Sequence, residues 1–590
     1  MKNLCNACHD PRHFNAGRHG FKGENRMSDY AANPSDIPET AVTTRVHDVA
    51  IVGLGPVGQV LALLLARNGH DVVVVEKQTE PYPLPRAVHY DGDISRVLDG
   101  LGLADFMAEF SSASDIYEWQ NAARETLLQF RFPLEGPQGW PESTMFNQPS
   151  LEDRLRRRAG DFPNIRVLRG TEAVGIEQGE DHATLAITSP TLKHKKLRAR
   201  YIVGCDGARS FVRQYMNTAV TDLGFFYDWL IVDILPKEHR DWVPDNLQVC
   251  DPVRPTSAVN GGPGRRRFEF MRMPQDNLKT FDTDETAWSL LEPWGVSPAN
   301  AALERRALYT FQARYASSWR DGRIFLAGDA AHQMPPFFGQ GMVSGVRDAV
   351  NLAWKLDLAL QGAAGDALLD SYDSERSAHV QHAIGMSVEL GKVICETDPA
   401  AVAARDAHFL ANGPDPVSAL PPIPPERLGR GAFPGGDPLA STVAGIIGMQ
   451  ARVRFADGVT DLLDRRTFGG FTLICDGSAV GPEAAVELAG SFPEGITGWV
   501  VRVLPPGSAL PAELRPETTT AAPDGVLTVQ DTGNRYLEYL AGYGHIAQLF
   551  RPDFYVYDGA VTLPELQSLI TGLGASLSLD KGVHSGSAAL

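Results

Sequence analysis

Gly53-Leu54-Gly55-Pro56-Val57-Gly58 is the stretch of sequence that decides the fold. Residues 46–52 before it are almost wholly apolar, as in a buried strand, and apolar residues then recur at helical spacing over 56–68. A second, β-branched run follows at 72–76. This succession predicts strand, tight turn, helix and strand, which is the first unit of a dinucleotide-binding α/β fold.

The three glycines each meet a requirement of dinucleotide binding. Gly53 permits the tight turn, Gly55 lets the backbone approach a pyrophosphate, and Gly58 lets the helix pack on the strand. The N-terminus of the helix adds free N–H groups and partial positive charge for the phosphates. Glu76 ends the second strand 18 residues after Gly58 and can accept hydrogen bonds from a ribose diol. The motif predicts a dinucleotide but does not distinguish NAD from FAD.

Composition argues against several classes of partner. The 590 residues carry 72 acidic and 54 basic side chains, a net charge of −18, so neither nucleic acid nor a membrane is expected as a partner. The run 49–66 is apolar enough to suggest a membrane span, but the glycine turn inside it and Arg67 directly after it argue against one. Six scattered cysteines suit no disulfide framework and favour a cytoplasmic location.

Hydropathy and composition divide the chain into six expected parts. They are a disordered leader (1–45), the first part of the nucleotide-binding domain (46–224), an inserted antiparallel-sheet domain for substrate (225–311), the second part of the nucleotide-binding domain with further helices (312–411), a Pro/Gly-rich linker (412–440) and a separate C-terminal α/β domain (441–590). Eight prolines and five glycines among the 29 linker residues argue against regular structure there.

The leader contains Cys5-Asn6-Ala7-Cys8-His9, which formally matches a c-type haem attachment site. Zinc is a weaker alternative, with Cys5 and Cys8 as ligands beside a histidine. Because neither export nor a folded haem pocket is signalled, an incidental tail is the favoured interpretation.

Two later segments carry a family resemblance. Cys205-Asp206-Gly207-Ala208-Arg209-Ser210 resembles the DG motif, and Leu326-Ala327-Gly328-Asp329-Ala330-Ala331-His332 the GD motif, of FAD-dependent aromatic monooxygenases with the para-hydroxybenzoate hydroxylase fold. With the glycine turn, these signatures stand in the family's order between residue 46 and about 380. The resemblance implies a Rossmann-like FAD-binding domain, FAD as cofactor, and NADH or NADPH with O2 as co-substrates.

Shorter matches refine the resemblance. Segments 250–255, 266–271, 345–349 and 351–356 resemble the enzymes that hydroxylate 3-(3-hydroxyphenyl)propanoate. The C-terminal domain is similar to the thioredoxin-like domain of phenol hydroxylases, and Arg551-Pro552-Asp553 fits that pattern. Its single cysteine, Cys475, excludes dithiol chemistry, so a packing role or a homodimer contact is expected.

The resemblance also implies a set of cofactor contacts. Asp329 would hydrogen-bond the hydroxyls of FAD, although capping of the segment after it is compatible. Arg86 would contact a phosphate or the flavin, unless it is only a surface arginine, and Gln148 resembles a glutamine that touches the cofactor. A helix N-terminus after the glycine turn at 339–345 would stabilise negative charge on reduced flavin. The full expected set is Gly53, Gly55, Gly58, Glu76, Arg86, Gln148, Asp206, Gly328, Asp329, Pro335, Gly341 and Met342.

For the chemistry, the resemblance points to Asp91. This carboxylate would accept the phenolic proton, and a structural turn role is an equal alternative. The family usually has an acidic pair here, whereas Gly92 separates Asp91 from Asp93 in this chain. Arg254 and Arg267 are the expected ligands of a substrate carboxylate, although the sequence does not rank them against the arginines at 265–266. No metal is expected.

The expected activity is therefore hydroxylation of a phenolic ring ortho to its hydroxyl, with NAD(P)H and O2. The resemblance names 3-(3-hydroxyphenyl)propanoate or a near relative as substrate. One alternative is a larger phenolic, polyketide-type or resorcinol-type ring. Another is a non-catalytic binding protein that keeps the FAD fold.

Overall fold

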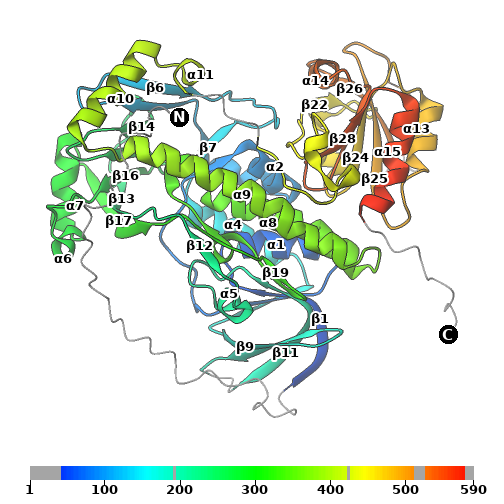
Figure 1. Cartoon of the computed structure of the whole chain (residues 1–590), viewed down its shortest axis with the longest axis horizontal. Helices are drawn as coiled ribbons and strands as arrows, with labels where there is room; N and C mark the ends of the chain where they lie inside the picture. The colour runs from blue at the N-terminus through cyan, green and yellow to red at the C-terminus, as the bar shows by residue number, and fades with distance from the viewer. Residues whose placement is uncertain (1–41, 191–193, 421–425, 511–524, 578–590) are drawn as a thin grey trace.

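The computed structural model describes residues 42–190, 194–420, 426–510 and 525–577, so the cysteine pair of the leader lies outside the described residues. Within these ranges the chain forms a mixed α/β fold with three large sheets (Figure 1). None of the helices in these ranges combines the length and apolar character needed to cross a membrane.

The first sheet is built on β1 (Val42–Val52), which runs parallel to both of its neighbours, β2 (Val72–Glu76) and β11 (Lys195–Gly204). Its order is β19-β20-β11-β1-β2-β8, with β19 at Arg320–Asp321, β20 at Ile324–Leu326 and β8 at Ile165–Arg169. The antiparallel hairpin of β9 (Glu172–Gln178) and β10 (Ala183–Thr188) is attached to β11. β1 begins inside the expected leader of residues 1–45, so regular structure starts earlier than predicted.

Helix α1 (Pro56–Arg67) follows β1 through the glycine turn, as predicted. The helix packs against the sheet and against α8 (Gly341–Leu360) through apolar side chains. Among them, Val60, Leu61, Leu63 and Leu65 are fully buried. Helices α8 and α9 (Asp366–Ile394) run side by side across the molecule, and α10 (Pro399–Asn412) follows (Figure 1).

The second sheet is antiparallel except for one pair of strands. Its order is β17 (Ala301–Phe311), β13 (Tyr227–Pro236), β16 (Arg266–Met271), β15 (Thr256–Asn260), β14 (Asn246–Val249), β5 (Ile116–Gln120) and β6 (Thr126–Arg131). β5 and β6 come from the segment assigned to the nucleotide-binding domain, so the predicted bounds 225–311 omit part of this sheet. The parallel pairing of β5 with β14 joins sequences more than a hundred residues apart, which local patterns do not reveal.

The C-terminal sheet has the order β23-β22-β26-β25-β24-β27-β28, in which β22 is Arg452–Arg454 and β23 is Thr460–Leu462. The strands β24 (Phe471–Asp476), β25 (Gly498–Leu504) and β26 (Val526–Asp531) are parallel, whereas β27 (Ala547–Phe550) and β28 (Val556–Ala560) are antiparallel. Helices α13 (Pro482–Ala489), α14 (Arg535–Gly542) and α15 (Leu563–Ser576) accompany it. This domain forms a separate lobe in Figure 1.

The predicted linker at 412–440 has little regular structure in its described part. It contains one short helix, α11 (Pro416–Ala419), and isolated 3-10 turns. It is nevertheless packed rather than loose, because Leu428, Ala432 and Phe433 are buried. The linker therefore belongs to the junction between the two parts of the molecule.

Candidate active site

A cavity of about 1390 Å³ lies where the glycine turn, the N-terminus of α8 and the second sheet meet. Eight of the predicted site residues line it: Gly55, Arg86, Asp91, Gln148, Arg267, Asp329, Gly341 and Met342. Seven others do not: Gly53, Gly58, Glu76, Asp206, Gly328, Pro335 and Arg254. The structure thus gathers residues from five separate stretches of sequence around one space.

The three glycines of the turn have two different surroundings. A Cβ at Gly53, whose φ is +103°, would lie 2.4 Å from the carbonyl oxygen of Cys205, and one at Gly58 would lie 2.2 Å from that of Gly53. A Cβ at Gly55 would meet no protein atom within 4 Å. Gly53 and Gly58 are therefore required by packing, whereas Gly55 faces the open space where a pyrophosphate would lie.

Glu76 braces the turn instead of lining the cavity. Its two carboxylate oxygens accept hydrogen bonds from the N–H of Leu54 (2.9 Å) and of Gln78 (2.8 Å). The side chain is half-buried at the end of β2, beside the turn. It holds the loop that would carry the nucleotide, and contact with a ribose stays a prediction.

Asp206 caps a helix rather than facing the cavity. One carboxylate oxygen accepts a hydrogen bond from Ser210 Oγ, and the other accepts from the N–H of Phe211 (2.7 Å) and of Val212 (3.2 Å) at the start of α5 (Phe211–Met216). In this structure the carboxylate serves the helix N-terminus, and its expected contact with the cofactor stays a prediction. Its neighbours Cys205 and Gly207 do line the cavity.

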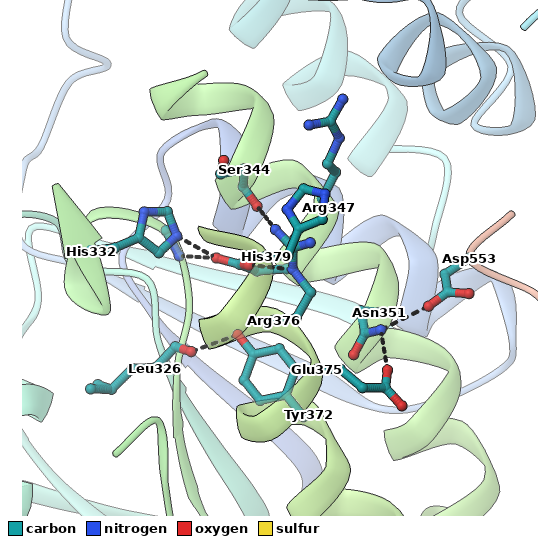
Figure 2. Close-up of polar contacts among 12 residues, drawn as sticks. Leu326, His332, Ser344, Arg347, Asn351, Tyr372, Glu375, Arg376, His379 and Asp553 are labelled. Carbon is teal, nitrogen blue, oxygen red and sulfur yellow. Dashed lines mark hydrogen bonds and ion pairs between the residues drawn. The ribbon is translucent and has the colours of Figure 1, made fainter. Parts of the chain in front are cut away.

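The GD turn is held by a buried ionic network that the sequence did not predict (Figure 2). Asp348, on α8, accepts from the N–H of Gly328 (3.0 Å) and lies 2.8 Å from both His332 Nε2 and Arg376 Nε. Arg376 also donates to the carbonyl of Ser344. Burial would raise the pKa of Asp348, but His332 and Arg376 hold this pKa below its usual range. The network fixes the turn against α8. In the sequence, only the position of a polar residue, Asp348, on the buried face of this helix could have indicated it.

Asp329 follows Gly328 and projects into the cavity. Its side chain is exposed, and among the described residues no hydrogen bond to its carboxylate is found. Burial by the surrounding walls raises the pKa of the carboxyl, which His332, Arg86 and Arg213 counteract. An acceptor held at the cavity wall without a protein partner is what the hydroxyls of a bound nucleotide or ribityl chain require.

Gln148 and Arg86 form the adjoining wall. Gln148 Oε1 accepts from the N–H of Ala87 (2.7 Å) and of Arg86 (3.3 Å), while its amide donates to Glu152 (2.7 Å). The guanidinium of Arg86 lies over the ring of Tyr82, 4.3 Å from its centroid. Gln148 therefore positions the Arg86 loop, and the charge of Arg86 remains available to the cavity.

Asp91 ends β3 (His89–Asp91) beside a guanidinium that the sequence did not single out. Arg347 Nη2 lies 2.8 Å from Asp91 Oδ2, and Arg347 Nε lies 2.7 Å from Asp93 Oδ2. Gln340 Nε2 also donates to Asp91 Oδ2 (2.8 Å). Burial raises the pKa of Asp91, although Arg347 and His89 pull it down. Gly92 does not break the acidic pair, because both carboxylates converge on one arginine.

The two predicted substrate arginines have different surroundings. Arg254 pairs with Asp276 (2.7 Å) and donates to the carbonyl of Met271, so the structure places it outside the cavity lining. Arg267 does line the cavity, but it pairs with Asp233 (2.7 Å) and donates to the carbonyls of Pro85 and Arg86. Neither arginine is free to act as a simple carboxylate receptor.

These features fit FAD. Gly55 leaves space for a pyrophosphate, Asp329 offers an unused acceptor, and no side chain caps the N-terminus of α8, which opens at Gly341 onto the cavity. The model of the FAD binding domain family matches residues 46–387. The chain belongs to this family.

Curated members of the FAD binding domain family match nearly the whole chain. The probable NADH-specific resorcinol 4-hydroxylase of Rhodococcus jostii (strain RHA1) is 36% identical over 532 residues, which cover 90% of this chain and 95% of that protein. The 3-(3-hydroxy-phenyl)propionate/3-hydroxycinnamic acid hydroxylase of Escherichia coli (strain K12) is 32% identical over 542 residues, covering 89% and 94%. The chain is thus a flavin-dependent aromatic hydroxylase that uses FAD and a nicotinamide co-substrate.

Solved structures agree on the fold of this family member. The flavin-dependent monooxygenase PieE, in complex with FAD and substrate, matches with a TM-score of 0.72 and 22% identity, covering 90% of this chain and 99% of that one. At this identity the match supports the fold alone.

Proposed function

We propose that the protein hydroxylates a small phenolic ring ortho to its hydroxyl, consuming NADH or NADPH and O2. The observation that carries this proposal is a continuous cavity that joins the glycine turn and Asp329 to the second sheet. Its volume of about 1390 Å³ exceeds the usual range of about 300–1,000 Å³ for a single ligand site. There is accordingly room for an aromatic substrate beside FAD.

The substrate has two candidates. The sequence resemblance favours 3-(3-hydroxyphenyl)propanoate or a near relative. A resorcinol-type ring is the second candidate, supported by the 36% identity to a probable resorcinol 4-hydroxylase, whose name also suggests NADH as the electron donor.

Asp91 is the proposed proton acceptor. It lies in the cavity wall, and Arg347 and Gln340 both hold the same carboxylate oxygen, Oδ2. This arrangement leaves Oδ1, which lies 3.8 Å from His89 Nε2, to accept from a phenolic hydroxyl, whose ionisation makes the ring a stronger nucleophile. Bound FAD would supply the activation of O2, and the residues described here would orient the ring and take its proton.

The second sheet would carry the substrate, as an inserted domain, and the C-terminal lobe would have a thioredoxin-like fold without dithiol function. Cys475 is buried and free, which is compatible with a reducing cytoplasmic location. A homodimer is also proposed, with the C-terminal lobe as the first surface to test.

The decisive experiment is nicotinamide oxidation by the flavinated protein across a panel of phenols, with hydroxylated product quantified against O2 consumed. Stimulation by a phenol with nearly stoichiometric product would support the proposal. Oxidation without product, or no response to any phenol, would contradict it. Comparing NADH with NADPH in the same assay identifies the donor.

A further inference from the structure

The wall of the second sheet that faces the cavity carries a compact ionic cluster. Strand pairing places Asp233 of β13 directly between Arg267 of β16 and Arg305 of β17. Two residue pairs further along, Glu269 of β16 lies opposite Ile231. Arg267, Arg305 and Glu269 all line the cavity, and the alternation of side chains along a strand puts Arg267 and Glu269 on the same face.

Asp233 forms a bidentate ion pair with Arg267 and so neutralises its charge. Two guanidinium nitrogens of Arg267 donate to the two Asp233 oxygens at 2.7 and 3.0 Å, and the carbonyls of Pro85 and Arg86 accept further N–H groups. Both charged side chains are only 3% exposed. Arg267 is therefore a fixed part of the wall, with little donor capacity left for a ligand.

Arg305 and Glu269, in contrast, have polar atoms that make no hydrogen bond within the described residues. Arg305 is 3% exposed, and its Nε and Nη1 have no hydrogen-bond partner in the described structure, since the nearest Asp233 oxygen is 3.7 Å away. Among the described residues no hydrogen bond to the Glu269 carboxylate is found either, and Arg267 is 3.8 Å from it. A buried donor and a buried acceptor that both face one cavity indicate a ligand able to donate and accept.

The charges of this cluster decide between the two candidate substrates. Asp233 and Glu269 balance the two arginines when both carboxyls are ionised; burial raises the pKa of Glu269, and Arg267 and Arg305 counteract this rise. A substrate carboxylate bound at Arg305 would lie close to Asp233 and near Glu269, and like charges in a buried site repel strongly. A hydroxyl can accept from Arg305 and donate to Glu269 without adding charge.

We propose that Arg305 and Glu269 bind a second hydroxyl of the substrate, so that the preferred substrate is an uncharged dihydroxybenzene rather than an arylpropanoate. This inference rests on the proposed phenol hydroxylation and specifies its substrate class. The apolar residues Ile231 and Phe311 on the same wall would pack against the ring.

The test is a comparison of resorcinol, phenol and 3-(3-hydroxyphenyl)propanoate with the flavinated protein. Dissociation constants come from the change in flavin absorbance, and kcat/KM from product formation. Resorcinol is expected to bind about 10- to 100-fold more tightly than either of the others, because each lacks or replaces the second hydroxyl. Equal or tighter binding of the propanoate would overturn the inference.

Variants separate the charge effect from a folding effect. Glu269→Gln is expected to weaken resorcinol binding about tenfold or more and to improve the binding of the propanoate relative to resorcinol. Glu269→Asp keeps the charge and should keep the discrimination against the propanoate. The control is Glu304→Gln. Glu304 lies on β17, pairs with Arg265 and does not line the cavity, so all three ligands should bind as in the unchanged protein.

The outcomes distinguish this inference from the proposed function. Product from the propanoate but not from resorcinol contradicts the inference and leaves phenol hydroxylation standing. No product from any phenol contradicts the proposed function itself. Unchanged binding of all three ligands in Glu269→Gln contradicts the role of Glu269. If Glu269→Gln does not fold, the ligand comparison with the unchanged protein and the charge-retaining Glu269→Asp still decide the matter.

Discussion

At the scale of single residues, the site depends on carboxylates whose surroundings differ. Asp329 has no protein partner for its carboxylate among the described residues, whereas Asp91 is held by Arg347 and Gln340. The first arrangement leaves an acceptor for a ligand, and the second orients an acceptor for a proton. The two residues therefore predict different losses when they are changed.

Asp329→Ala should weaken FAD binding by about tenfold or more, because it removes a charged acceptor that the protein does not otherwise use. Titration of the flavin-free protein with FAD, followed by flavin fluorescence, measures this loss. Asp241→Ala is the matched control, since Asp241 is exposed at the surface and its ion pair is with the exposed His239. A fully flavinated Asp329→Ala protein would contradict the assigned contact.

Asp91→Asn should reduce kcat for hydroxylation by about 10²–10⁴ while FAD binds as before. The pKa of Asp91 is raised by burial, so the unchanged protein should lose kcat/KM as the pH falls, starting above the usual range of a carboxyl. Below that pKa the group is protonated and accepts no proton. The pH profile of kcat/KM checks this, and the acid limb should vanish in Asp91→Asn. An identical profile in both proteins would leave Asp91 a structural partner of Arg347.

At the scale of elements, the turn between β1 and α1 combines packing and binding in six residues. Gly53 and Gly58 allow strand and helix to approach, and Gly55 leaves space above the N-terminus of α1. Stability and FAD affinity can thus be separated by changing one glycine at a time.

Gly58→Ala should destabilise the protein by about 1–3 kcal/mol, because the new Cβ would lie 2.2 Å from the carbonyl oxygen of Gly53. Gly55→Ala should unfold like the unchanged protein when flavin-free, yet bind FAD at least about tenfold more weakly. Urea unfolding and FAD titration of both variants measure the two effects. A large loss of stability in Gly55→Ala would show that its role is structural too.

At the scale of the whole molecule, a buried ionic junction joins the C-terminal lobe to α8 and α9. Glu375 lies 2.8 Å from Lys355 and 2.7 Å from Arg551, and Arg551 lies 2.6 Å from Asp553. Asn351 donates to both Glu375 and Asp553 (Figure 2). All of these side chains are buried, so the lobe is attached through a fully desolvated contact.

The junction predicts acid sensitivity. Although burial raises the pKa of Glu375, Arg551 and Lys355 lower it to about 2. Because the folded pKa lies below the unfolded one, Glu375 stabilises the protein above about pH 4.5, and this contribution is lost as the pH falls toward 2. Glu375→Gln should therefore cost about 3 kcal/mol near pH 6 and progressively less below pH 4.

Urea unfolding at pH 6, 4 and 3 measures the difference between the two proteins. Glu483→Gln, an exposed change on α13, should unfold like the unchanged protein at each pH. A difference between Glu375→Gln and the unchanged protein that does not depend on pH would contradict the ionic account.

The C-terminal lobe also reaches the cavity. Ile447 lines it, and Gln450 donates hydrogen bonds from its backbone N–H to the carbonyl of Pro137 and from its side-chain amide to that of Gln138, two residues that line the cavity as well. Arg96 further pairs with Asp464 at 2.8 Å. The lobe thus braces one edge of the site, in keeping with the packing role proposed for it.

The sequence alone determined the glycine turn, the helix that follows it and the α/β class, and it singled out Asp329, Gly341 and Arg86, which line the cavity. These features depend on residues that are adjacent or regularly spaced in the chain, where backbone requirements and hydropathy act locally. Only the tertiary structure decided which ionic groups meet. Asp233 and Arg267 are 34 residues apart, and Glu375 and Arg551 are 176 apart. The fate of each charge, whether free for a ligand or used by the protein, is set by partners that folding brings together.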